Sequence, residues 1–125
     1  MATDVIVEKH AETIKMDIHE VARRMLGHLG PTLVAALAGG RDRKLPYRWA
    51  KADGPEPGDD AKVRLTTAHI VWSLISEADS DYVARAWFIG VNPRLGDEQP
   101  YMAIRAGRFA ETLAAARAFV EGTTE

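Results

Sequence analysis

Residues 84–122 read ARAWFIGVNPRLGDEQPYMAIRAGRFAETLAAARAFVEG, and this stretch decides the fold. Its first part has the apolar composition of a buried helix end, which closes in the run WFI at Ile89. The pair Asn92-Pro93 stops that helix, because a proline disfavours helical geometry in the residue before it. An Arg-Leu-Gly turn is expected directly after the proline, where the glycine permits a left-handed backbone.

Two more helices are expected after this turn. Pro100 suits the first position of a short helix, and Gly107 permits the left-handed conformation that ends it. The last helix is expected from about Arg108 to Gly122 and is amphipathic. Its apolar stripe recurs at steps of four, three and four residues and comprises Phe109, Leu113, Ala116 and Val120, with Phe119 beside it.

Helical spacing also marks the chain upstream. A first helix is expected from about Glu12 to Leu29, with five apolar residues on one face: Ile14, Ile18, Val21, Met25 and Leu29. Gly30-Pro31 is expected to end this helix and to open a second, short one, because proline is well suited to a first helical position.

Turn residues divide the next part of the chain. The glycines at 39–40 end the second helix, and a third is expected to begin near Pro46. An acidic Pro/Gly loop at 52–61 leads into a long helix that the aspartates at 59–60 are expected to cap. The Asp-Ser-Asp sequence at 79–81 ends that helix and caps the following one.

We therefore expect an all-α fold, a small bundle of six or seven helices. Its expected parts are a loose N-terminal arm (1–11), a helix-turn-helix-like domain (12–78) and a C-terminal helical domain (79–125). A chain of 125 residues with 46% hydrophobic content is long enough for these parts to share one core.

Composition and spacing exclude several classes of function. The formal net charge is -2, so the chain has no overall basic field that attracts nucleic acid. Cysteine is absent, which removes disulfides, thiolate metal sites and a thiol nucleophile. The four histidines lack the spacing of a helical zinc site, and no phosphate loop is present. We expect no enzymatic activity, no cofactor, no membrane span and a cytoplasmic location.

The one basic segment, RDRKLPYRWAK, occupies residues 41–51. Two short helices around a Gly-Gly turn, the second of them basic, are what a helix-turn-helix requires. Under that interpretation the cations that meet DNA are Arg41, Arg43, Lys44, Arg48 and Lys51. A solvated surface with Trp49 as a core anchor accounts for the same residues. Pro46 and the acidic loop that follows weigh against DNA contact.

The order of helix-ending and helix-starting residues in the C-terminal part resembles that of Xre/MbcA/ParS-type antitoxins. In that family a W-x₄-N-P-x-L-G-like stretch precedes a P-x₃₋₆-G element and a terminal helix, as Trp87–Gly96, Pro100–Gly107 and the last helix do here. The first half is similar to the Xre-like helix-turn-helix of the same family, whose second helix often carries an Arg-Trp pair like Arg48-Trp49. The resemblance thus extends over much of the chain.

The resemblance implies an antitoxin that binds and blocks a RES-type, NAD-consuming toxin and binds no NAD itself. The toxin contacts it implies are Arg94, Arg105, Arg108, Phe109, Leu113, Phe119 and Val120. It also implies a homodimer or a larger toxin-antitoxin assembly, and repression of the antitoxin's own operon through operator DNA. Two alternatives stay open: a stand-alone helix-turn-helix regulator without a toxin, and a helical scaffold that pairs only with itself.

Overall fold

The computed structural model describes the backbone of residues 2–122 and the side chains from residue 5 to residue 122. Over this range the chain is all-α and has no strand, which confirms the expected fold class. The helices are α1 (Ala2–Ile14), α2 (Ile18–Leu29), α3 (Pro31–Leu37), α4 (Lys44–Trp49), α5 (Asp59–Ala78), α6 (Asp81–Ile89), α7 (Pro100–Arg105) and α8 (Phe109–Val120), with a 3-10 turn η1 (Pro93–Leu95).

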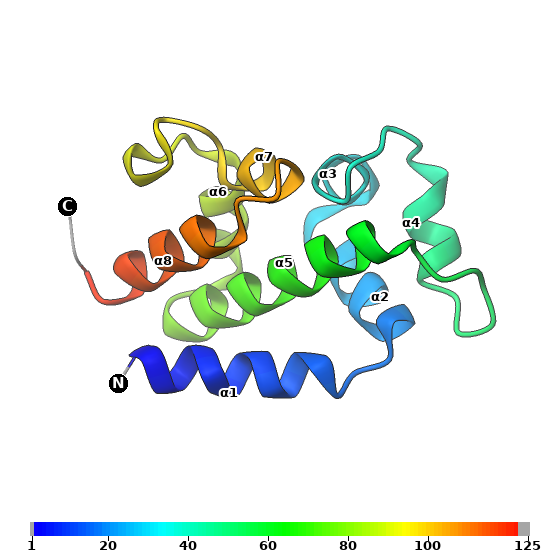
Figure 1. The fold of residues 1–125 in the computed structure, drawn as a ribbon, viewed down its shortest axis with the longest axis horizontal. Helices are drawn as coiled ribbons and strands as arrows, with labels where there is room; N and C mark the ends of the chain where they lie inside the picture. The colour runs from blue at the N-terminus through cyan, green and yellow to red at the C-terminus, as the bar shows by residue number, and fades with distance from the viewer. Residues whose placement is uncertain (1, 123–125) are drawn as a thin grey trace.

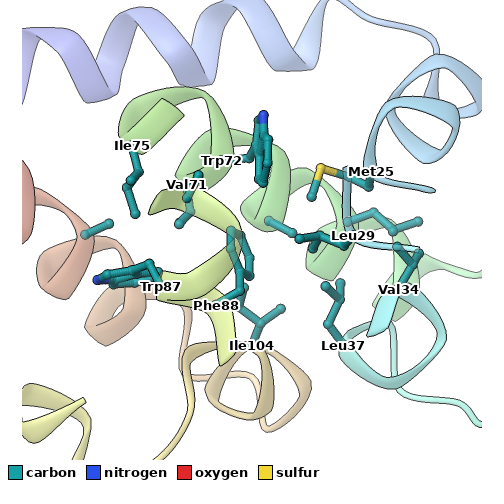
Figure 2. Packing of buried hydrophobic residues seen from close by; sticks show 14 of the residues in the cluster. Met25, Leu29, Val34, Leu37, Val71, Trp72, Ile75, Trp87, Phe88 and Ile104 are labelled. Carbon is teal, nitrogen blue, oxygen red and sulfur yellow. The ribbon is translucent and has the colours of Figure 1, made fainter. Parts of the chain in front are cut away.

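Helix α5 is the longest helix and lies at the centre of the bundle. Helices α1 and α8 both pack along α5 and contact each other, while α2, α3 and α4 gather around its N-terminal half (Figure 1). One continuous buried cluster includes residues from α2 to α8 (Figure 2). Phe88 is fully buried in it and contacts Trp87 edge-on, with their ring centroids 5.9 Å apart. The core therefore crosses the predicted boundary at residues 78–79.

The expected loose arm at residues 1–11 is corrected by the structure from Ala2 onward, where α1 begins, and residue 1 lies outside the described residues. Val5 and Ile6 pack against the core, and Lys9 and Thr13 continue the same face of the helix. The Lys9 ammonium forms ion pairs with Glu77 of α5 and with Glu12. A helix of this length gains most of its stability from packing, which a weak local pattern does not reveal.

The expected first helix is in fact two helices. The Asp17 side chain accepts a hydrogen bond from the backbone N–H of His19 at 3.2 Å, and so caps the N-terminus of α2. Ile14 ends α1 and is 62% exposed, whereas Val21 and Met25 are buried. The predicted apolar face was therefore wrong at its first member, because the chain changes direction between the two helices.

Most other helices begin and end at the residues that the sequence predicted. Pro31 and Pro100 occupy first helical positions, and the Ser80 hydroxyl caps α6 by accepting from Val83 N–H at 3.1 Å. Asn92 caps η1 in the same way, by accepting from the backbone N–H of Arg94. One cap differs: Gly58 is the N-cap of α5, and the aspartates at 59–60 lie in its first turn.

A buried histidine joins α1 to α5. His69 is 3% exposed, and its Nδ1 is hydrogen-bonded to the Thr13 hydroxyl at 2.9 Å. Burial lowers the pKa of His69 to about 4, with smaller contributions from the positive charges of Arg24 and His28. Since an unfolded histidine titrates near pH 6.5, the folded state disfavours the protonated ring.

This difference predicts a pH-dependent stability. The folded pKa lies below the unfolded pKa, so the contribution of the neutral ring is complete above about pH 6.5 and is lost as the pH falls toward 4. Its size is on the order of 3 kcal/mol. Urea unfolding of wild type and His69→Gln at a series of pH values measures it. We expect the stability difference between the two proteins to narrow at low pH, and a constant difference would contradict the assignment.

Candidate partner-binding groove and basic surface

An apolar groove of about 370 Å³ lies between α1 and α8, with α5 as its floor. Val63 of α5 is 49% exposed within it, although a valine at this position would normally be buried in a bundle. Phe109 and Leu113 form the α8 wall and are only partly buried. The full lining is His10, Lys62, Val63, Thr66, Thr67, Ile70, Phe109 and Leu113.

The groove continues toward the start of α8. A second hollow of about 230 Å³ shares Val63 and Phe109 with it and extends to Gly107, Asp60 and Arg64. These two shared side chains are therefore the centre of one apolar depression. Its charged rim is mixed, because Lys62 is paired with Glu56 at 2.6 Å. The depression offers apolar contact area rather than a field of one sign.

Two of the seven predicted toxin contacts, Phe109 and Leu113, line this groove together. Phe119 is 42% exposed at the far end of α8, and Val120 beside it is partly buried against the core. Arg94 is exposed in η1, outside both hollows. The structure thus brings two of the predicted toxin contacts together in the groove and places Arg94, Phe119 and Val120 outside it.

The two remaining predicted contacts make hydrogen bonds within the chain. Arg105 Nη1 donates to the carbonyl oxygens of Ala36 at 2.7 Å and Gly40 at 2.9 Å, so this side chain faces α3. Arg108 donates two hydrogen bonds to the Glu111 carboxylate, at 3.0 and 2.8 Å, and lowers the pKa of that carboxyl. These arginines hold segments of this chain in place, and their predicted role toward a toxin stays a prediction.

The groove also contains residues that the sequence did not suggest. His10 lies in the part of α1 that was expected to be a loose arm, and no sequence pattern distinguishes Val63 from the core residues of α5. Thr66 and Thr67 carry no pattern that distinguishes a groove floor from a solvated face. Only the excess of apolar residues on both sides of α5 signalled a second apolar surface.

The predicted DNA contacts form a separate surface around α4. Arg41, Arg43, Lys44, Arg48 and Lys51 are all exposed. Trp49, in contrast, is 8% exposed, and its carbonyl accepts a hydrogen bond from His19 Nδ1 at 2.9 Å, which confirms its expected place in the core. Helix α4 has only six residues and begins at Lys44, two residues before Pro46.

Other kinds of site find no support in residues 2–122. No three histidine or carboxylate side chains between residues 5 and 122 are placed to share a metal ion. None of the described helices combines the length and apolarity needed to cross a membrane. Comparison with models of known protein families, with curated proteins and with solved structures found no match.

Proposed function

We propose that this chain is an antitoxin that binds a RES-type, NAD-consuming toxin and suppresses its activity without catalysing a reaction. The observation that carries the proposal is the half-open groove centred on Val63 and Phe109, beside the C-terminal signature that resembles the toxin-binding domain of Xre/MbcA/ParS-type antitoxins. A groove of this kind suits an apolar side chain or a helix of a protein partner.

The local architecture supports a preformed binding surface. Arg108 Nη1 donates to the carbonyl oxygen of Leu95 at 3.2 Å, which ties the turn after Asn92 to the start of α8. Thr112 Oγ1 donates to the carbonyl oxygen of Arg108 at 2.7 Å in the same helix. A binding element that is already ordered loses less entropy when a partner docks, which favours affinity.

The proposal is tested with the RES-domain toxin of the native host. We expect NAD consumption by the purified toxin to stop when this chain is added in stoichiometric amount, because the bound chain would block the toxin. Bovine serum albumin at the same concentration is the control. NAD consumption that continues at a large excess of this chain would contradict the proposal.

A stand-alone regulator that binds duplex DNA is the second candidate. It is favoured by the exposure of the five cations between Arg41 and Lys51. Under this hypothesis Arg48→Ala weakens binding to the recognised duplex by about 1–3 kcal/mol, and affinity falls steeply with salt. Operator repression by the antitoxin would use the same residues.

A further inference from the structure

A hollow lies beside α4 and shares no lining residue with the apolar groove. Its volume is about 470 Å³, within the range of about 300–1,000 Å³ that is typical of sites for small molecules. It is formed where the loop between α3 and α4 comes close to the start of α3. Its lining is Pro31, Arg41, Asp42, Arg43, Lys44 and Tyr47, and we call it the basic cleft.

The basic cleft has three cations and one carboxylate. The Asp42 carboxylate accepts a hydrogen bond from the backbone N–H of Lys44 at 2.9 Å, so it is used to hold the start of α4. No carboxylate in the described part of the chain lies within ion-pair distance of Arg41, Arg43 or Lys44. These three side chains are free to meet an anionic ligand such as phosphate.

An aromatic ring stands among these cations. Tyr47 is 53% exposed and follows Lys44 by three residues on α4, so the two side chains lie on the same face of the helix. An exposed tyrosine flanked by arginines and lysines offers a stacking surface for a nucleobase together with contacts for its phosphates. An anion without a ring system would leave the tyrosine unused.

The loop that carries the arginines is held from beneath. Arg105 binds the carbonyl oxygens of Ala36 and Gly40, and Arg64 Nη1 donates to the carbonyl oxygen of Ala38 at 3.4 Å. A Cβ on Gly39 would lie 2.7 Å from Arg64 Nη1, so the glycine allows this close approach. The wall of the basic cleft is therefore positioned by two side chains from α5 and α7.

We propose that the basic cleft binds single-stranded nucleic acid, with one base stacked on Tyr47 and phosphates held by Arg41, Arg43 and Lys44. The shape of α4 favours a single strand over a duplex. Of its six residues Pro46 and Trp49 are buried in the protein, so the helix presents only about one turn to a ligand. A recognition helix has to enter the major groove, whereas a concave cleft accepts an unpaired base.

The test compares a single strand and a duplex by fluorescence anisotropy. The probes are a labelled oligo(dT) of about twelve nucleotides and the duplex that it forms with oligo(dA), lengths in the range of single-strand sites. We expect tighter binding of the single strand. With three phosphates neutralised, the logarithm of its binding constant should fall against the logarithm of salt concentration with a slope of about -2.

Variants of Tyr47 separate stacking from charge. Tyr47→Leu should weaken binding of oligo(dT) about tenfold, while Tyr47→Phe keeps the ring and should bind as wild type does. The matched control is Tyr82→Leu, because Tyr82 is 82% exposed on α6 and does not line the basic cleft. Circular dichroism confirms that each variant is folded.

Three results would overturn the proposal. Tighter binding of the duplex would assign this surface to duplex DNA. If Tyr47→Leu and wild type bind oligo(dT) with equal affinity, no base stacks on Tyr47 and the binding is non-specific attraction between charges. Absence of binding at low salt would remove nucleic acid from this site altogether. None of these outcomes depends on the toxin, so the antitoxin proposal stands or falls separately.

Discussion

Replacing Phe88 with alanine should lower the free energy of unfolding by about 4 kcal/mol, the largest stability effect that we expect from one substitution. Phe88 is 0% exposed, and its ring packs between those of Trp87 and Trp72 (Figure 2). The ring centroids of Phe88 and Trp72 are 6.4 Å apart. Alanine leaves a cavity where residues of α5, α6 and α7 meet, and the surrounding helices can fill it only in part.

Urea unfolding followed by circular dichroism measures this loss. Tyr82→Ala is the control on the same helix, since that ring is 82% exposed and its removal should change stability by less than about 0.5 kcal/mol. A loss below about 1 kcal/mol for Phe88→Ala would mean that the helices around this ring do not share the core described above.

The second large effect concerns binding. Val63→Asp places a carboxylate at the centre of the apolar groove, where a docked partner would leave it without water or a counter-ion. We expect the affinity for the toxin to fall at least about thirtyfold, the size of a hot-spot loss. Because Val63 is 49% exposed in the free chain, the fold should survive the change. Inhibition of NAD consumption by increasing amounts of each variant gives the affinity.

Two further variants locate the interface. Val91→Asp makes the same chemical change at a residue that is 68% exposed and does not line the groove, and it should inhibit as wild type does. Phe119→Asp changes the exposed aromatic ring at the end of α8. If Phe119→Asp abolishes inhibition while Val63→Asp does not, the toxin docks on the end of α8 and the groove assignment is wrong.

The helix ends could be predicted because single residues determine them locally. Ser80, Asn92 and Pro100 lie at the starts of their elements, and Gly107, with a positive φ of 81°, follows the end of α7. Each acts through its own backbone geometry or through a hydrogen bond two or three residues away. Such signals are visible in one sequence without knowledge of the tertiary structure.

The groove could not be predicted, because it depends on contacts between distant segments. His10 and Phe109 lie 99 positions apart and meet only because α1 and α8 pack along the same helix. Arg105 illustrates the same limit, since its partners Ala36 and Gly40 precede it by more than sixty residues. In the sequence, a solvent-exposed arginine looks the same as one that holds two helices together, and only the fold distinguishes them.

The most direct measurement is affinity purification of the tagged chain from its native host at high salt, followed by mass spectrometry. High salt screens the charges that retain nucleic acid and preserves an apolar interface. The antitoxin proposal predicts a stoichiometric protein partner of RES type, whose NAD consumption this chain suppresses and whose recovery fails with Val63→Asp. Recovery of the chain without any stoichiometric partner would contradict it.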